Sequence, residues 1–197
     1  MSVIVLVKDN DRFVIGSDIR ASCDNGFYTD MYRGNKKIRH LDINKEIIIG
    51  CVGNVAMLDT FDTLINKLNV IDRKSLVNNI VPALMKSFKS TVFECGNGLL
   101  DGELVIASGK KAFVITSNYN VIEIEDTYVL GSGSLIALGT LFVTEHFNLT
   151  PEERVEIAIR AAGTYVNTVS KEAVIGDTKG NDIKPFSSNR FLKKSKK

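Results

Sequence analysis

The chain has 197 residues, of which 44% are apolar and 24% are charged, an ordinary balance for one globular domain. Lys and Arg number 25 against 23 Asp and Glu, and this near-balance argues against a dedicated nucleic-acid binder, which needs a basic excess. The charge is unevenly placed, because residues 184–197 hold six basic residues and no acid. We therefore predict one domain over residues 1–182 and a basic, disordered tail over residues 183–197.

The compartment is predicted from hydropathy and cysteine usage. No stretch approaches the roughly 18 consecutive apolar residues of a membrane span. The apolar run at residues 3–7 is too short for a signal peptide and lacks a basic region before it. The three cysteines, Cys23, Cys51 and Cys95, cannot all pair and show no CxxC spacing. We interpret them as free thiols and expect a cytoplasmic protein without a membrane contact.

The first half of the chain predicts strands followed by two helices. Apolar runs at 3–7 and 13–16 flank a polar turn and predict a hairpin, and residues 46–53 predict a buried strand that ends in a small-residue turn. Apolar spacings of three and four then predict helices over 55–68 and 75–88. Ser75 is the expected cap of the second helix. Pro82 predicts that this helix begins nearby or is kinked.

The second half repeats this order. Runs at 103–107, 112–116 and 121–124 are separated by short polar loops and predict hairpins, and a fourth run covers 128–130. A Gly131-Ser-Gly-Ser134 turn precedes a buried helix over 135–147, and Thr150-Pro151 starts a helix that runs to about 167. We predict an α+β fold, with two antiparallel sheets between two helix layers in an αββα sandwich. An ordinary α+β sandwich also satisfies the pattern.

Candidate catalytic groups are few. The chain has two histidines, no GxSxG elbow, no Cys/His cluster for zinc, and no lysine that would make Gly131-Ser-Gly-Ser134 a phosphate loop. Ser2 stands out, because removal of Met1 before a small residue leaves a hydroxyl and a free α-amine on one residue. Such an amine titrates at about 7.7–8.0 and can act as a general base. The alternative is that Ser is merely a common second residue.

Five short segments, taken in order, resemble one family. They are Ser2-Val-Ile-Val, Ile15-Gly-Ser-Asp-Ile-Arg-Ala-Ser22, Asn35-Lys-Lys-Ile-Arg-His-Leu41, Ile48-Ile-Gly-Cys-Val-Gly-Asn54 and Leu130-Gly-Ser-Gly-Ser-Leu-Ile-Ala-Leu-Gly139. Together they resemble the proteasome β-subunit group of N-terminal nucleophile (Ntn) hydrolases, closest in style to the bacterial HslV peptidase. The resemblance covers residues 2–170 and implies the four-layer αββα fold of that family.

The resemblance also implies catalytic roles. Ser2 matches the N-terminal nucleophile, which is threonine in the family. Asp18, sixteen residues later, matches the conserved aspartate. Lys37 matches the catalytic lysine, and Lys36 is the rival assignment if the register slips by one residue. The structural alternative for Asp18 and Lys37 is an ion pair that supports the first sheet.

Two further positions complete the predicted site. Gly53 matches the glycine whose backbone N–H forms the oxyanion hole, and Ser132 matches a serine that hydrogen-bonds at the N-terminus. Alternatively, Gly53 is a close-approach residue after a strand, and Ser132 caps a helix. The chain departs from the family at Asn54, where a second glycine is usual, and in residues 163–169, which lack the usual aspartate.

By this resemblance the chain is a peptidase that cleaves peptide bonds inside a homo-oligomeric ring, with an AAA+ ATPase unfoldase as partner and without a cofactor. Activation would require only the removal of Met1. The alternatives are a catalytically inactive structural or assembly subunit of the same fold, and an amidase for a small metabolite. The resemblance leaves cation binding open and assigns no role to the basic tail.

Overall fold

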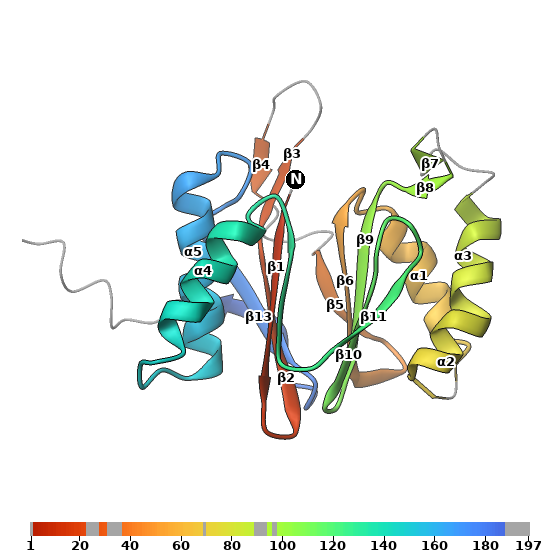
Figure 1. Cartoon of the computed structure of the whole chain (residues 1–197), viewed down its shortest axis with the longest axis horizontal. Coiled ribbons are helices and arrows are strands. Elements are labelled where there is room, and N and C mark those ends of the chain that lie inside the picture. Colours follow the sequence, from red (N-terminus) through yellow and green to blue (C-terminus); the bar gives the residue numbers. More distant parts are fainter. Residues whose placement is uncertain are drawn as a thin grey trace, which may run out of the picture.

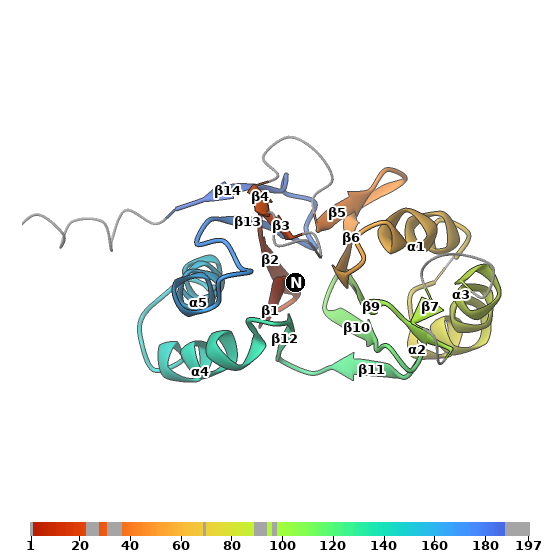
Figure 2. The ribbon, with the colours of Figure 1, turned by 90° about the horizontal axis from the view of Figure 1, so that it is seen from above.

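The computed structural model describes residues 2–22, 28–30, 37–68, 70–88, 94–95 and 98–187. Two five-stranded antiparallel sheets face each other between two layers of helices (Figures 1 and 2). The first sheet consists of β1 (Val3–Asp9), β2 (Arg12–Asp18), β12 (Thr127–Gly131), β13 (Ala173–Asp177) and β14 (Lys184–Phe186). The second consists of β5 (Ile38–Leu41), β6 (Asn44–Gly53), β9 (Gly102–Ser108), β10 (Lys111–Ile115) and β11 (Val121–Ile124).

The remaining elements are helices and two short hairpins. The helices are α1 (Met57–Ile65), α2 (Arg73–Ser75), the π-helical turn η1 (Leu76–Ile80), α3 (Val81–Phe88), α4 (Ser134–Thr144) and α5 (Pro151–Tyr165). The hairpins pair β3 (Arg20–Ser22) with β4 (Tyr28–Asp30) and β7 (Glu94–Cys95) with β8 (Leu99–Leu100). The strand order is β12-β1-β2-β13-β14 in the first sheet and β11-β10-β9-β6-β5 in the second.

Three apolar cores hold the four layers together. In β1, Ile4 and Leu6 pack in the core between the two sheets, whereas Val3 and Val5 pack against α4 and α5. Because both faces of the first sheet are covered, β1 is apolar at every one of its first five positions. A third core joins the outer face of the second sheet to α1, η1 and α3. The predicted four-layer sandwich is therefore confirmed.

The start of the second helical segment differs from the prediction. Asp72, and not Ser75, is the cap, because its carboxylate accepts a hydrogen bond of 2.7 Å from the backbone N–H of Ser75. The helix then widens into η1, where the N–H of Val81 donates to the carbonyl of Leu76, five residues back. A proline ring collides with the carbonyl four residues earlier in a regular α-helix. The π-helical turn directly before Pro82 accommodates that ring within a continuous helix.

The C-terminal boundary of the domain also differs from the prediction. The disordered tail was expected to begin at residue 183, but Ile183 is buried and Lys184–Phe186 forms β14, paired with β13. Pro185 obscured this strand in the sequence, since proline is tolerated in a sheet only at an edge, where β14 lies. The ordered domain therefore continues through Phe186. Residues 188–197 of the predicted tail lie outside the described residues.

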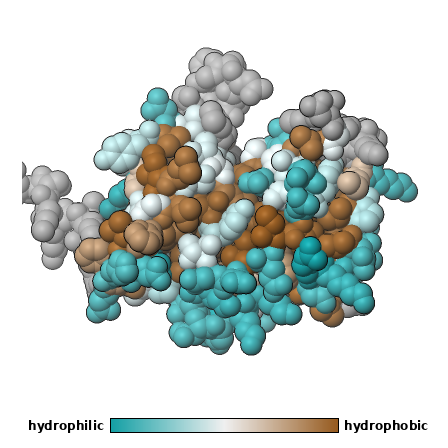
Figure 3. Space-filling view, viewed as in Figure 1, coloured by the Kyte–Doolittle hydropathy of each residue, from teal (hydrophilic) through white to brown (hydrophobic). Residues whose placement is uncertain are grey.

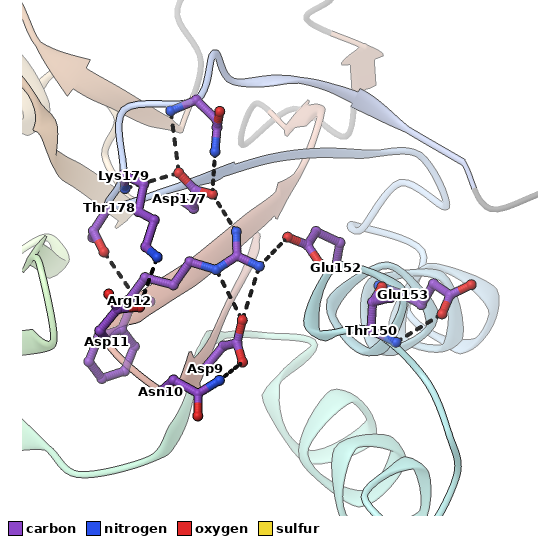
Figure 4. Close-up of polar contacts among 12 residues, drawn as sticks. Asp9, Asn10, Asp11, Arg12, Thr150, Glu152, Glu153, Asp177, Thr178 and Lys179 are labelled. Atoms are coloured by element: carbon purple, nitrogen blue, oxygen red, sulfur yellow. Dashed lines mark hydrogen bonds and ion pairs between the residues drawn. The ribbon is translucent and has the colours of Figure 1, made fainter.

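Arg12 joins three elements at the end of the molecule opposite Ser2 (Figures 1 and 4). Its guanidinium forms ion pairs with Asp9 in the same hairpin, Glu152 in the first turn of α5, and Asp177 at the end of β13. Burial opposes the charge of Arg12, but these acidic partners outweigh it and raise its pKa. The network fixes the hairpin against α5, whose predicted Thr150 cap forms a complete capping box with Glu153.

Candidate active site

Ser2 lies directly before β1, and its residue is only 2% exposed. Its carbonyl oxygen accepts hydrogen bonds from Ser132 Oγ at 3.4 Å and from the N–H of Gly133 at 3.5 Å. Gly131, with φ of +93°, passes so close that a Cβ there would lie 2.1 Å from the same oxygen. Only glycine permits this approach in that backbone conformation. The Gly131-Ser-Gly turn thus fixes the backbone at Ser2.

Asp18, at the end of β2, is buried and accepts four hydrogen bonds. Its Oδ1 accepts from the N–H of Val3 at 2.9 Å and from Lys37 Nζ at 2.6 Å. Its Oδ2 accepts from the N–H groups of Arg20 and Ser170, both at 3.1 Å. These donors come from four separate segments, so the carboxylate is fixed in place one residue from Ser2.

Lys37 reaches Asp18 from the opposite sheet. It directly precedes β5, and its carbonyl accepts a 2.9 Å hydrogen bond from the N–H of Cys51 in β6. The side chains of Lys37 and Asp18 are 1% and 0% exposed, so the ion pair is fully removed from water. The pairing of β5 with β6 thus places Lys37 at Asp18. The alternative residue, Lys36, lies outside the described residues. Because burying a charge pair is expensive, such a pair is by itself weak evidence for stability.

Gly53 ends β6 beside the same turn. Its φ is +94°, and a Cβ there would lie 2.3 Å from the carbonyl oxygen of Asp101. The N–H of Asn54 bonds toward β9, and strand alternation directs the N–H of Gly53 to the opposite side, as it does that of Cys51. The side chain of Val52 lies 3.3 Å from the Cβ position of Gly131, which itself contacts Ser2. The end of β6 therefore lies next to the segment that carries Ser2.

Two neighbours of the site were missed by sequence reasoning. Thr168 Oγ1 lies 3.2 Å from Ser132 Oγ in a hydrogen bond, and Ser170 donates its N–H to Asp18. Both residues are buried and follow α5, Thr168 within residues 163–169, which lack the family's usual aspartate, and Ser170 directly after them. A usable signal was Gly163 inside a helix, where glycine destabilises unless close packing requires it. A Cβ at Gly163 would lie 2.4 Å from the carbonyl oxygen of Ser170.

The structure also limits the other chemistries at this place. Cys51 hydrogen-bonds to Lys37 through its backbone, but burial and the nearby charge of Asp101 raise the pKa of its thiol to about 12. Cys51 therefore stays protonated and is a poor nucleophile.

Across the ranges that the structure describes, no three His, Cys, Asp or Glu side chains gather as metal ligands. No helix within those ranges has the length and hydropathy to cross a membrane.

Solved structures share this architecture, although no protein-family model matches the chain. BPH from Thiobacillus denitrificans superposes with a TM-score of 0.72 at 18% sequence identity, over 89% of this chain and 96% of that chain. The same protein in complex with epoxomicin gives 0.71 at 17% identity, over 89% and 97%. Eukaryotic HslV from Trypanosoma brucei gives 0.67 at 18% identity, over 89% and 98%.

The chain has an HslV-like fold. The similarity to BPH and HslV extends over nearly the whole length of those chains. It confirms the predicted four-layer αββα sandwich and, at the level of the fold, the resemblance on which the site residues were predicted.

Proposed function

We propose that this HslV-like chain is a peptidase whose nucleophile is the hydroxyl of Ser2, made N-terminal by removal of Met1. The observation that carries the proposal is the buried ion pair of Lys37 and Asp18, because Asp18 also binds the N–H of Val3, the residue next to Ser2. A lysine that is buried near an N-terminal residue can affect the α-amine of that residue. Its positive charge disfavours a second positive charge on the α-amine of Ser2 and so keeps that amine available as a base.

The proposed reaction has two stages. The α-amine takes the proton of Ser2 Oγ, and Oγ attacks the carbonyl carbon of a peptide bond. The C–N bond of the tetrahedral intermediate then breaks, the proton passes to the leaving amine, and an ester to Ser2 remains. In the second stage the same amine takes a proton from water, whose oxygen attacks the ester carbon. The C–O bond to Ser2 then breaks, the N-terminal peptide leaves as a carboxylic acid, and the proton on the amine returns to Ser2 Oγ.

Gly53 and Ser132 serve this chemistry without reacting. The N–H of Gly53 donates to the oxyanion that develops on the substrate carbonyl, an interaction whose loss typically costs about 2.7–4 kcal/mol. Ser132 holds the carbonyl of Ser2, and Asp18 holds Lys37. The proposed nucleophile is serine, which lacks the methyl group that restricts the χ1 rotation of threonine. The contacts at its backbone are therefore the more important for its orientation.

The remaining parts of the proposal concern partners. The substrate is a peptide or an unfolded protein, the working form is a homo-oligomeric ring in the cytoplasm, and an AAA+ ATPase unfoldase supplies the substrate. This part is supported by the HslV-like fold. No cofactor takes part in the proposed steps.

The test uses a set of fluorogenic peptides and protein that begins at Ser2. The rate at which this protein hydrolyses them is compared with the rates of three variants. We expect Ser2→Ala to lose at least about 1,000-fold in kcat/KM, because the nucleophile is removed. Ser2→Thr should retain activity, since it keeps the hydroxyl. Ser108→Ala, at the far end of β9, is the matched control and should have no effect. Activity unchanged by Ser2→Ala would refute the mechanism.

Covalent labelling separates the alternatives. Epoxomicin, the ligand in one BPH structure, is a suitable probe, and we expect it to add to the wild-type chain but not to Ser2→Ala. A chain that begins at Ser2, takes no label and cleaves no peptide would be an inactive structural subunit. Hydrolysis of small amides without hydrolysis of peptides would instead indicate a metabolic amidase.

A further inference from the structure

A carboxylate without a partner continues the buried face of β9. On this strand Val105 and Ala107 are fully buried in the core between the two sheets. Since residues of a strand alternate between its faces, Glu103 is on the same side, but it is only half-buried. Within the described ranges no hydrogen bond or ion pair reaches its carboxylate, and burial raises the pKa of the group. Because an unpaired charge in such a position is unfavourable, the carboxylate is suited to a cationic ligand.

Glu103 lies near the turn that fixes Ser2. It is directly opposite Val52 in the pairing of β9 with β6. A side-chain carbon of Val52 lies 3.3 Å from the Cβ position of Gly131, and Gly131 contacts the carbonyl of Ser2. The Cβ atoms of directly opposed strand residues are about 4.5–5.5 Å apart. Glu103 is therefore separated from the Ser2 turn by the width of a single strand.

The end of β9 is open because the two sheets are offset at this end of the molecule. The contact of Val52 with Gly131 places β12, the edge strand of the first sheet, over β6. The other strands of the first sheet extend from β12 toward the side of β5, so β9 lies beyond that edge. The space-filling view shows the surface hollowed between the two sheets at the end where the N-terminus lies (Figures 1 and 3). A peptide at Ser2 can therefore reach Glu103.

Tyr128 supplies an aromatic ring near this carboxylate. It lies on the inner side of β12, where it packs partly against the core between the sheets. Burial and the charge of Glu103 both raise the pKa of the Tyr128 hydroxyl, so the two groups are close enough to interact electrostatically. A guanidinium group can pair with a carboxylate and also lie against an aromatic ring. The two side chains therefore match the side chain of arginine.

The same groups do not suit a metal ion. Calcium takes about six to eight oxygen ligands, and magnesium is held in a regular octahedron of oxygens. Within the described ranges no set of three acidic, histidine or cysteine side chains includes Glu103. A cationic side chain needs only one carboxylate for a charge-assisted hydrogen bond and is the better fit.

We propose that Glu103 and Tyr128 form a subsite for a basic side chain of the peptide substrate, with arginine preferred to lysine. The inference rests on the proposed function, because it names the substrate class of the site at Ser2. An extended peptide advances about 3.3 Å per residue, so the basic residue lies within about three residues of the bond that is cleaved. Lysine also pairs with the carboxylate, but its ammonium group lacks the planar face that stacks on a ring.

The first test measures the hydrolysis of peptides that differ at one residue. Arginine, lysine or citrulline, which keeps the shape of arginine without its charge, is placed at each position within about three residues of the cleaved bond. At one position we expect arginine to exceed citrulline at least about ten-fold in kcat/KM, because only arginine forms a charge-assisted pair. Glu103→Gln should reduce this ratio to about one. Equal rates for the two peptides, or a ratio that survives Glu103→Gln, would overturn the subsite and leave the peptidase proposal intact.

Two further sets of variants sharpen this test. Glu123→Gln is the matched control, because it removes an exposed carboxylate from β11 of the same sheet and should keep the ratio of arginine to citrulline. Tyr128→Phe should keep the preference for arginine over lysine, since the ring remains, whereas Tyr128→Leu should lower it. An unchanged preference in Tyr128→Leu would contradict the role of the ring.

The second test separates the subsite from the peptidase activity. The Ser2→Ala protein lacks the proposed nucleophile, so fluorescence anisotropy measures its affinity for labelled arginine and citrulline peptides without cleavage. We expect the arginine peptide to bind at least about ten-fold more tightly, and the difference to vanish when Glu103→Gln is added. This result together with a wild-type chain that cleaves no peptide would refute the proposed function and leave the subsite intact. Equal affinities of the two peptides for Ser2→Ala would overturn the subsite.

Discussion

At the scale of single residues, the buried pair of Lys37 and Asp18 is the contact on which the proposed chemistry depends most. Removing one partner leaves an uncompensated buried charge, which typically costs about 3–5 kcal/mol. We therefore expect Lys37→Met and Asp18→Asn each to lower the free energy of unfolding strongly. The variant with both changes should be less destabilised than the sum of the single changes, because it removes both charges together. Denaturant titration of the four proteins measures this coupling.

The same four proteins distinguish a catalytic lysine from a structural ion pair. If Lys37 acts on the amine of Ser2, the double variant should fold and yet lose peptide hydrolysis. A folded double variant that retains wild-type kcat/KM would show that the pair only supports the two sheets.

Asp177 gives a prediction for acid stability. Burial raises its pKa, but hydrogen bonds from the Asn181 side chain, the N–H of Lys179 and Arg12 outweigh burial and lower the pKa below its ordinary value. A carboxylate with a lowered folded pKa stabilises the fold above its unfolded pKa, and this stability is lost as the pH falls through the folded pKa. Asp177→Asn should therefore cost about 1–3 kcal/mol at pH 7. It should also flatten the loss of stability as the pH falls below about 5.

The control for this change is Asp182→Asn, because the Asp182 side chain is 83% exposed and its ion pair with Lys45 is on the surface. Exposed pairs contribute about 0–1 kcal/mol. Thermal unfolding at a series of pH values measures the stability of both variants. An acid profile of Asp177→Asn that parallels the wild type would contradict the assignment.

The site residues that could be predicted from the sequence are those whose side chains have a distinctive chemistry. Asp18 is predicted from its spacing after Ser2 and Lys37 from the Lys-Lys-Ile-Arg motif, and the structure brings Lys37 Nζ within 2.6 Å of Asp18 Oδ1. Ser170 could not be found in this way, because it contributes a backbone N–H, which every residue except proline possesses. The hydroxyl pairing of Thr168 with Ser132 depends on how the segment after α5 folds back, which is a tertiary property.

At the scale of elements, two helical glycines make a matched pair. Gly163 in α5 lies against Ser170, whereas Gly139 in α4 faces open space. Gly163→Ala should displace the segment that binds Asp18, with a loss of about 1–3 kcal/mol in stability and a lower kcat. Gly139→Ala should instead gain up to about 1 kcal/mol, because alanine favours the helix. The denaturant midpoints of the two variants, measured at low protein concentration, compare these changes in stability. Equal changes in the two variants would contradict the close packing at Gly163.

Most elements could be predicted from their apolar patterns, since each helix buries one face, whereas the strands of the two sheets are covered on both faces and are short apolar runs. The hairpin of β9 and β10 and the capping box at Thr150 follow local rules that the sequence carries directly. The cap at Asp72 was missed because two polar residues, three positions apart, both suited the role. In the structure Asp72 takes this position, because its backbone is extended and its carboxylate accepts the N–H of Ser75.

At the scale of the whole molecule, the corrected boundary makes a prediction about truncation. Removing all residues after Asp182 deletes β14 and Ile183, whose side chain fills the space beside Gly176. We expect that truncation to lower the thermal midpoint by several degrees, since burial of one Ile side chain stabilises by about 1.5–3 kcal/mol. Truncation after Ser187 leaves β14 intact and is the control. Equal midpoints for the two truncations would show that β14 contributes nothing to the domain.

The central claim is that Ser2 becomes the first residue and acts through its own amine. The intact mass of the protein, purified after expression from this sequence, tests that claim most directly. We predict a mass lower than that of the full chain by one methionine, with Ser2 at the N-terminus by sequencing. Retention of Met1 on protein that hydrolyses peptides would contradict the account, because the amine of Ser2 would then be part of a peptide bond and could not act as the base.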